Sequence, residues 1–320
     1  MKNTKKQWIA VLTVSLLCLV ACKERDTHYE YYDKDNTKPH KVFEVDKATG
    51  KMDGSYKEFD KNGTLILEGS FEDGMRNGTF KEYRKDGKIM VESTYKNDVV
   101  EGPVKAYNGE GKLVSKGEIR DGKYVHTKFF TDSRDGQKYP VVVIGARVWM
   151  AANLNYETEE SRCFDDEESN CEIYGRLYSW DDAEEVCPDG WDIPSYNEWN
   201  ALNEFVGGKY VAGKMLKNAS GWSNNDWRKD GYGIDAFGFS ALPAGMGFYK
   251  PSSFRGQKFI FEGRAFMKTE NRSAYFWSST EDGHNEMYGE KISYLSNDVS
   301  LDFPTYKKQT WLSVRCVKDE

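Results

Sequence analysis

A repeat of 24 residues is the feature that most constrains how this chain can fold. Two glycine positions recur in three successive rows: Gly54, Gly78 and Gly102 for the first, and Gly63, Gly87 and Gly111 for the second. Between the glycines, apolar residues alternate with polar ones, which is the period of a half-buried strand. Asn62-Gly63 and Asp86-Gly87 tolerate the positive φ of a tight turn. Each row therefore predicts a β-hairpin, and the hairpins must stack because a lone hairpin cannot bury its apolar face.

Two of these rows resemble a known family. Gly54-Ser-Tyr-Lys-Glu-Phe-Asp-Lys-Asn-Gly63 and Gly78-Thr-Phe-Lys-Glu-Tyr-Arg-Lys-Asp-Gly87 are similar to the MORN-type repeat variant of bacterial exported proteins, over residues 41–127. The resemblance implies an architecture used as a spacer or a protein-binding surface, and some members are labelled antitoxin-like. A charged set here is a candidate ligand face: Lys57, Glu58, Lys81, Glu82 and Lys105. Charges on one face of a sheet are more often solvated surface, and that is our expectation.

The first 21 residues predict export. Lys2, Lys5 and Lys6 precede an apolar run, Trp8 to Val20, that is too short to span a bilayer comfortably. The ending Leu19-Val-Ala-Cys22 resembles a bacterial lipobox, which implies cleavage before Cys22 and acylation of that cysteine. Several acyl chains attach a protein stably, whereas one chain alone is marginal. An ordinary cleaved signal and an uncleaved helix are the alternatives.

Charge and cysteine content agree with a place outside the cytoplasm. Cleavage removes three lysines and no acidic residue, which changes the formal net charge from -7 to -10. A chain this acidic, with no concentrated basic face, is a poor candidate for binding nucleic acid. Four cysteines remain in the mature chain besides Cys22: Cys163, Cys171, Cys187 and Cys316. They predict two disulfides, with three possible pairings, and their spacing is unlike that of a zinc site.

Between the signal and the repeats, residues 22–40 are charged and polar, which predicts a tether. The alternative is that Tyr29, Tyr31 and Tyr32 belong to a first edge strand.

A second domain is expected from residue 128 to residue 320, because the period is lost and the composition changes near Phe129. It holds all the tryptophans except Trp8: Trp149, Trp180, Trp191, Trp199, Trp222, Trp227, Trp277 and Trp311. Capping residues predict helices over 179–187 and, from a capping box at Ser195 and Glu198, over 195–206. Short strands are expected at 141–144, 275–277 and 311–317, which makes an α+β pattern.

Nine motifs of this second domain follow one another in an order that resembles the Fibrobacter succinogenes major paralogous domain. Among them are Tyr174-Gly-Arg-Leu-Tyr-Ser-Trp180, Cys187-Pro-Asp-Gly-Trp-Asp-Ile-Pro-Ser195, Phe237-Gly-Phe-Ser-Ala-Leu-Pro-Ala-Gly245 and Ser313-Val-Arg-Cys-Val-Lys-Asp319. The family occurs on many exported proteins and implies no activity. Its arrangement is also similar to the C-type lectin and formylglycine-generating enzyme folds. By that analogy Cys187 pairs with Cys316, which leaves Cys163 to pair with Cys171.

The fold analogy suggests calcium-dependent sugar binding as a function, but the sequence contains few of the residues that such binding needs. The Glu-Pro-Asn and Trp-Asn-Asp motifs of such sites are not present in their places. Asp165-Asp-Glu-Glu168 is a candidate for calcium, but four consecutive acids lack the alternation with which one loop wraps an ion. We therefore expect no metal and no other cofactor.

An enzyme is not expected either, because no catalytic constellation is recognisable. A serine hydrolase needs a histidine base, and His28, His40 and His126 fall in the tether and repeats, which leaves only His284 in the second domain.

The expected function is a non-catalytic recognition or adhesion module on a cell-envelope lipoprotein, held in the outer membrane because no aspartate follows Cys22. Its ligand would be a polysaccharide or an envelope protein. Aromatic residues in glycine-rich stretches are the candidate binding residues: Trp222, Trp227, Tyr232 and Tyr249. A purely structural envelope component is the main alternative, followed by an uncharacterised enzyme.

Overall fold

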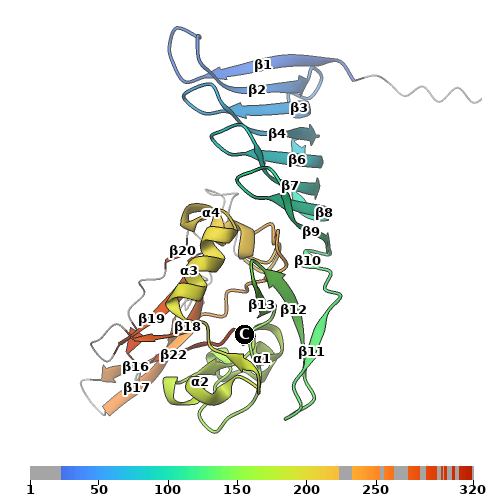
Figure 1. Ribbon diagram of the computed structural model, residues 1–320. Helices are drawn as coiled ribbons and strands as arrows, with labels where there is room; N and C mark the ends of the chain where they lie inside the picture. Colours follow the sequence, from blue (N-terminus) through green and yellow to red (C-terminus); the bar gives the residue numbers. More distant parts are fainter. Residues whose placement is uncertain are drawn as a thin grey trace, which may run out of the picture.

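The computed structural model describes residues 23–222, 233–252, 256–262, 273–281, 286–293, 297, 299–300, 305–306 and 310–318. A stack of strands forms one end of the molecule and a mixed domain of strands and short helices forms the other (Figure 1). Among the described residues, no helix is both long and apolar enough to cross a membrane.

The first sheet has ten strands, almost all of them paired with their neighbours in sequence. They are β1 (Arg25–Tyr31), β2 (Pro39–Asp46), β3 (Met52–Phe59), β4 (Leu65–Glu72), β5 (Met75–Arg76), β6 (Gly78–Tyr83), β7 (Ile89–Lys96), β8 (Val99–Tyr107), β9 (Leu113–Arg120) and β10 (Lys123–Tyr124). The order is β1-β2-β3-β4-β6-β7-β8-β9-β10, and β5 pairs with β4. The three rows of the sequence repeat therefore form the hairpins β3-β4, β6-β7 and β8-β9, as predicted.

The hairpin turns are closed by the residues that the repeat singles out. Gly63, Gly87 and Gly111 have φ of 83°, 80° and 84°, in the left-handed region that glycine adopts without strain. In the first turn, the Asp60 carboxylate accepts hydrogen bonds from the backbone N–H of Asn62 and of Thr64. The turn geometry thus follows from local side chains and fixes the register of each hairpin.

The predicted tether is wrong for residues 25–31, and the alternative of a first edge strand is confirmed for Tyr29 and Tyr31, whereas Tyr32 lies just after the strand. Residues 25–31 form β1, which pairs antiparallel with β2 from Arg25 opposite Asp46 to Tyr31 opposite Pro39. The alternation of polar and aromatic residues in this segment suits an edge strand that is exposed along its whole length. A composition poor in aliphatic residues indicated disorder, but an edge strand needs few of them.

One face of the repeat sheet carries its own aromatic core. Phe43, Tyr56, Phe71, Phe80 and Tyr95 follow one another across the strands, with neighbouring ring centroids 5.2–6.5 Å apart. Phe80 lies directly over a glycine of the next strand: a Cβ added at Gly69 would come within 2.5 Å of its ring. The glycine therefore makes room for a ring that could not otherwise lie flat on the sheet.

The other face carries a ladder of alternating charge. Lys57 stands opposite Glu68, Glu68 opposite Lys81, Lys81 opposite Glu92, and Glu92 opposite Lys105. The ammonium of Lys105 lies 2.8 Å from the Glu92 carboxylate, and that of Lys81 lies 3.4 Å from the Glu68 carboxylate. These charges neutralise one another, but apart from Lys57 they are half-buried, so the expected solvated surface is only partly present.

Two members of the charged set do not share that face. Side chains alternate along a strand, so Glu58 and Glu82 point to the opposite face from Lys57 and Lys81. The Glu58 carboxylate accepts a hydrogen bond from the hydroxyl of Tyr56, and Glu82 forms an ion pair with Lys214 of the second domain. The single ligand face considered above is therefore wrong.

The second domain combines two sheets with short helices. Its helices are η1 (Phe164–Asp166), α1 (Glu168–Tyr174), α2 (Trp180–Val186), α3 (Tyr196–Phe205) and α4 (Lys209–Leu216). Its first strands are β11 (Phe129–Thr131), β12 (Lys138–Ile144), β13 (Arg147–Met150), β14 (Leu177–Tyr178) and β15 (Trp191–Asp192). The rest are β16 (Met246–Ser252), β17 (Gly256–Glu262), β18 (Ser273–Glu281), β19 (Glu286–Ser293), β20 (Val299–Ser300), β21 (Thr305–Tyr306), β22 (Thr310–Ser313) and β23 (Val317–Lys318).

Both predicted helices are present, with the predicted caps. The Ser179 side chain accepts a hydrogen bond from the backbone N–H of Asp182, and Ser195 and Glu198 form the capping box. The sheet orders are β11-β12-β13-β23-β15 and β17-β16-β22-β18-β19-β20, with β14 on β22 and β21 on β19. The domain is therefore strand-rich. In the described part of the chain, the final segment is broken into β22 and β23 rather than continuous.

Two disulfides join the four cysteines. Cys187 bonds to Cys316, 129 residues away, and Cys163 bonds to Cys171, eight residues away. This is the pairing that the fold analogy implied.

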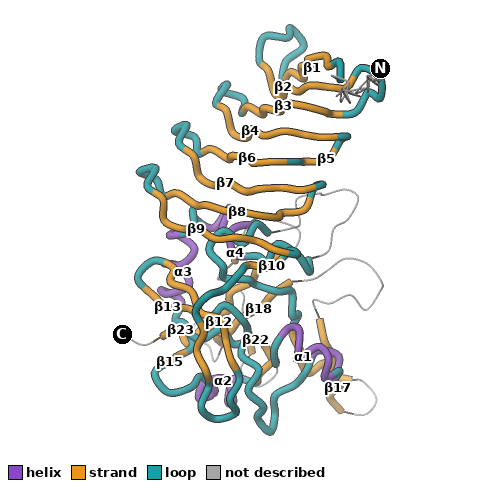
Figure 2. Tube along the Cα trace, turned by 90° about the vertical axis from the view of Figure 1, so that its right-hand side faces the viewer, coloured by secondary structure: helices purple, strands orange, loops and turns teal. Residues whose placement is uncertain are grey.

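The repeat sheet and the second domain share one core. Apolar residues of the last repeat, Val104 and Ile119 among them, belong to the same buried cluster as Trp199 and Phe239 of the second domain. Helix α4 lies beside the last strands of the sheet in both views (Figure 2). The boundary near residue 128 therefore separates two patterns of sequence but not two independent bodies.

Candidate functional site

The aromatic residues proposed for binding do not form a described surface. Trp222 is 3% exposed, its indole N–H donates to the backbone oxygen of Ala241, and the Lys217 ammonium lies 5.1 Å from its ring centroid. Trp222 is thus a core residue, and its assignment to a ligand site is wrong. Trp227 and Tyr232 lie outside the described residues, as does Cys22. Tyr249 belongs to β16, but its side chain is likewise outside the described part.

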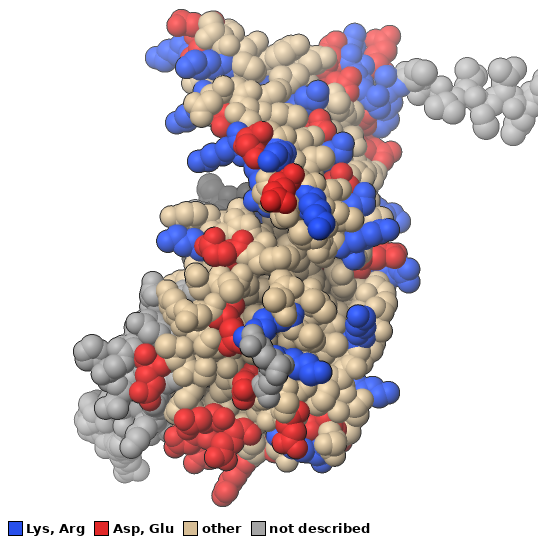
Figure 3. Space-filling view, in the orientation of Figure 1, with Lys and Arg blue, Asp and Glu red and all other residues tan. Residues whose placement is uncertain are grey.

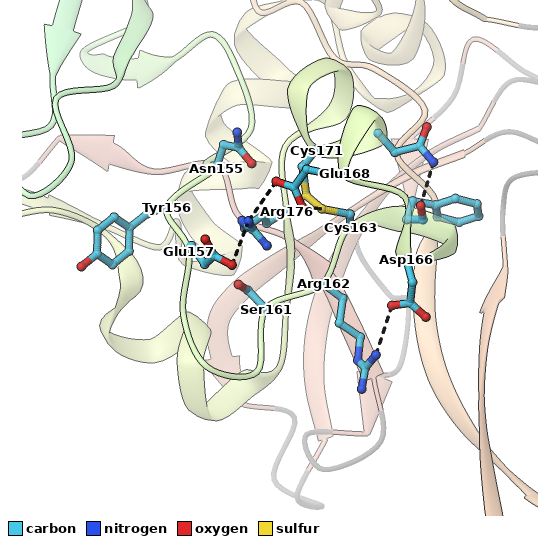
Figure 4. Close-up of a disulfide and its surroundings, with 12 residues drawn as sticks. Asn155, Tyr156, Glu157, Ser161, Arg162, Cys163, Asp166, Glu168, Cys171 and Arg176 are labelled. Carbon is cyan, nitrogen blue, oxygen red and sulfur yellow. Dashed lines mark hydrogen bonds and ion pairs between the residues drawn. A yellow bond between two sulfur atoms is a disulfide. The ribbon is translucent and has the colours of Figure 1, made fainter.

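The acidic run at 165–168 offers few free carboxylates. Asp166 pairs with Arg162 at 3.1 Å, and Glu168 pairs with Arg176 at 3.2 Å (Figure 4). The ligand atoms of Cys163, Glu168 and Cys171 lie within 4.8 Å of one another. Both sulfur atoms are joined in a disulfide, however, so neither is available as a thiolate ligand. Acidic side chains also gather elsewhere at this end of the molecule, around α2, whereas both signs mix over the repeat sheet (Figure 3).

A cleft lies at the junction of the repeat sheet and the second domain. It has a volume of about 340 Å³, in the range of small-molecule sites. The repeat sheet contributes Lys123 and Tyr124, the connecting segment contributes His126, and the second domain contributes the remaining walls. We call this the junction cleft.

Tyr124 holds the two sides of the junction cleft together. Its ring packs on a glycine of each side: a Cβ added at Gly117 of β9 would come within 2.2 Å of the ring, and one at Gly238 within 2.7 Å. Gly238 also has a φ of 69°, so a side chain there would be strained. A side chain at either position would clash with the ring, so Tyr124 can pack here only because both residues are glycine.

His126 extends this contact into the second domain. Its Nε2 lies 3.1 Å from Oγ of Ser240, and its ring centroid is 5.0 Å from that of Tyr124. Burial, followed by the charge of Arg315, lowers the pKa of His126 to about 4. The imidazole is therefore neutral at neutral pH, and its buried Nδ1 has no hydrogen-bond partner among the described residues.

Ser240 is in turn fixed by a buried carboxylate. The Asp235 carboxylate accepts hydrogen bonds from the backbone N–H of Ser240 at 2.8 Å and from its hydroxyl at 2.6 Å. Burial raises the pKa of Asp235 to about 7, and the hydrogen bonds from Ser240 oppose that rise. Asp235, Ser240 and His126 thus form a chain of polar contacts from the core to the cleft.

Arg315 forms the floor of the junction cleft. Its guanidinium donates to Oδ1 of Asn153 from Nε and from Nη2, at 3.1 and 2.6 Å, and to the backbone oxygens of Met150 and Phe239. It also lies 4.4 Å from the centroid of the Phe239 ring. Burial lowers the pKa of Arg315 to about 9, so the side chain stays cationic at neutral pH.

Asn155, which lines the cleft on the side of β12, carries a second buried acceptor. The Tyr139 hydroxyl accepts a hydrogen bond from the backbone N–H of Asn155, at 3.1 Å. The buried Oδ1 of Asn155 has no hydrogen-bond partner among the described residues. Two residues that line the cleft, His126 and Asn155, thus each carry a buried acceptor atom with no partner among the described residues.

The contacts of Ser240 differ from those of a hydrolytic triad. In a triad the histidine lies between the serine and the carboxylate, whereas here the serine lies between the histidine and the carboxylate. The Ser240 hydroxyl is already within hydrogen-bond distance of Asp235, and a histidine with a pKa near 4 is a weak base. The arrangement is better suited to holding a ligand than to activating a nucleophile.

Sequence reasoning missed the junction cleft because it assigned His126 to the repeats and excluded it from the second domain. One available signal was that the run from Phe237 to Gly245 places a serine among glycines and aromatic residues. No periodic pattern relates His126 to Ser240, which are 114 residues apart.

Comparison with known families identifies both parts of the chain. The model of the Fibrobacter succinogenes major domain matches residues 142–318, and that of the MORN repeat variant matches residues 52–73 and 76–97. The third hairpin, β8-β9, extends the same sheet beyond those two matches. A search of curated proteins found no match to this chain.

Proposed function

Since the chain belongs to the Fibrobacter succinogenes major domain family, for which no activity is implied, we propose from its own residues that it is a lipid-anchored recognition protein of the cell envelope. Its ligand would be polar and rich in hydroxyl groups, of the carbohydrate class, and would bind in the junction cleft. The observation that carries the proposal is a pair of buried acceptors, on His126 and Asn155, that have no partner among the described residues and belong to the lining of one cleft of suitable size.

The charge around the cleft favours an acidic sugar over a neutral one. Lys123 and Lys138 lie at the cleft with Arg315, and Glu172 is the acidic residue among its lining. A carboxylate on the ligand would be attracted to this side, by an amount that salt reduces. A uronic acid unit combines that carboxylate with the hydroxyl groups that the two acceptors need.

Export and lipid attachment of the protein follow from the lipobox at Cys22 and agree with the two disulfides, which form in oxidising compartments. An outer-membrane location remains part of the proposal. We further propose a C-type-lectin-like arrangement for the second domain. Its support is the bridge from Cys187, at the end of α2, to Cys316, between β22 and β23.

The test is calorimetric titration of the full chain in detergent with galacturonate oligosaccharides, and with xylan and cellulose oligosaccharides as neutral probes. We expect binding of the acidic series, weakened at least tenfold by Asn155→Ala and weakened by added salt. Asn200→Ala, on the exposed side of α3, is the matched control and should change nothing. No binding of any series, or equal binding by the Asn155 and Asn200 variants, would contradict the proposed site.

A structural role is the second candidate, and one observation favours it: the repeat sheet continues directly into the core of the second domain. A sheet that shares its core with the domain it carries is suited to a fixed spacing. If no ligand class binds in the titration and the protein is still anchored in the membrane, the structural role is favoured.

A further inference from the structure

The amino-terminal end of the described chain is fixed to the repeat sheet. The ammonium of Lys23 lies 2.7 Å from Oδ2 of Asp53 and 3.2 Å from Oδ1 of Asp73. The guanidinium of Arg25 lies 2.7 Å from Oδ1 of the same Asp53, whose side chain is almost completely buried. These contacts lower the pKa of Asp53 to about 2, so the carboxylate stays ionised at any physiological pH. The chain is thus held from Lys23 onward.

This contact leaves almost no free chain between the sheet and the proposed anchor. Cys22 is the residue before Lys23, and consecutive Cα atoms are about 3.8 Å apart. An acylated Cys22 would place its lipid within roughly 10 Å of Arg25. The end of the sheet that begins with β1 must then lie against the lipid headgroups.

The exposed edge of β1 suits that position. All seven of its residues are exposed, including Tyr29 and Tyr31, whose rings stack at 6.1 Å. Tyrosine is enriched where protein meets the membrane surface, because its ring is apolar and its hydroxyl is polar. An uncovered edge strand is otherwise prone to pair with other strands, and a covering surface prevents this.

A second copy of the chain is a less suitable partner for this edge. In β1, Asp26 and Glu30 outnumber Arg25. In an antiparallel pairing centred on His28, Asp26 of each copy would stand opposite Glu30 of the other, and opposed like charges are destabilising. The same acids give no attraction to anionic lipid, so the acyl chains would supply the attachment.

We propose that β1 lies on the membrane surface, with its tyrosines among the lipid headgroups, and that the repeat sheet stands upright on it. This inference rests on the proposed lipid anchor. With strands roughly 4.8 Å apart, β9 then lies about 35 Å from β1, and the junction cleft is held at that height above the membrane. Figure 1 shows β1 and the second domain at opposite ends of the molecule.

Two exposed tyrosines, one on β1 and one on α4 beside the last strands of the sheet, allow a matched test. The photoreactive residue benzoylphenylalanine replaces Tyr29, which is 56% exposed on β1, or Tyr210, which is 70% exposed on α4. The full acylated chain is placed in vesicles of phosphatidylethanolamine and phosphatidylglycerol and irradiated, and adducts are identified by intact-mass spectrometry. Acylation of Cys22 is read from the same spectra.

We expect lipid adducts from position 29 at least ten times as often as from position 210. Acylated protein without lipid adducts at position 29 would overturn the upright arrangement while leaving the anchor in place. Dimers cross-linked through position 29 would also overturn it and would make a second copy the partner of this edge. Protein without acylation at Cys22 would instead refute the anchor itself, and the arrangement with it.

Discussion

The repeat sheet and the second domain are stabilised in different ways. In the repeat sheet, strands pair with their sequence neighbours and half-buried charges pair across them, as Lys105 does with Glu92. In the second domain the decisive contacts cross long stretches of chain: Arg315 reaches Asn153, 162 residues away, and the Cys187–Cys316 bridge spans 129 residues. A periodic region is thus stabilised mainly by pairing between neighbouring strands. A loop-rich region also needs disulfides and buried hydrogen bonds between distant segments.

The largest effect is expected from the long disulfide. Replacing Cys187 and Cys316 with serine frees a long loop in the unfolded chain and should lower the free energy of unfolding by about 5 kcal/mol. Replacing Cys163 and Cys171 should cost about 2.5 kcal/mol, because that loop is short. Urea denaturation under non-reducing conditions measures both values. If the two double variants lose the same free energy of unfolding, the length of the closed loop does not determine the loss.

Two cations that differ in burial give the next largest difference. Arg315→Met should lower the free energy of unfolding by about 3 to 5 kcal/mol, because it leaves Asn153 and two backbone oxygens without their donor. Lys105→Met removes a half-buried partner of Glu92 and should lower the free energy of unfolding by at most about 1 kcal/mol. If the two variants lose similar free energies of unfolding, the charge ladder of the repeat sheet stabilises the protein more than solvated ion pairs usually do.

The third comparison concerns pH and separates two groups at the junction. Asp235 has a pKa near 7 when folded and 3.8 as its ordinary value, so it lowers stability as pH rises from about 4 to 7. His126 has a pKa near 4 when folded and an ordinary value of 6.5, so it raises stability as pH rises from about 4 to 6.5. The two contributions oppose each other in the intact protein.

Asp235→Asn removes only the first of these contributions. Relative to the parent, the variant should therefore gain stability from pH 4 to pH 7, and the gain should level off above pH 7. Urea denaturation at a series of pH values gives the difference directly. Parallel pH curves for the two proteins would mean that Asp235 titrates as it does in the unfolded chain.

The last comparison shortens the sheet and measures a distance. Deleting residues 78–101 removes one 24-residue unit, joins Asn77 to Gly102 in register, and brings Glu58 to the place of Glu82 beside Lys214. In anchored protein, the deletion should bring a fluorophore at position 210 about 10 Å closer to the vesicle surface, the width of two strands. Energy transfer to a lipid acceptor measures the change. An unchanged distance would contradict an upright sheet.

The sequence predicts the parts of this fold that local chemistry specifies. The three hairpins follow from glycine, asparagine and aspartate at fixed turn positions, and the start of α3 follows from the capping box of Ser195 and Glu198. Helix α4 was missed because it begins directly after Gly207 and Gly208, residues that indicate a helix end. Strand β1 was judged by its polar composition, although an edge strand buries little.

The junction cleft was beyond sequence reasoning for a different reason. Its residues come from separate segments, and only the packing of Tyr124 between Gly117 and Gly238 brings them together. Trp222 was misassigned because glycine-rich, polar surroundings in sequence indicated an exposed ring, whereas the ring is enclosed by Lys217 and the backbone of Ala241. Local composition does not report which loop covers which ring.

Differential scanning calorimetry of the intact chain tests most directly whether the repeat sheet and the second domain are one folding unit that creates the cleft between them. A shared core predicts a single transition, with calorimetric and van't Hoff enthalpies that agree. Gly238→Ala, which intrudes on Tyr124, should lower the temperature of that whole transition. Two separate transitions, only one of which moves in the variant, would contradict the account.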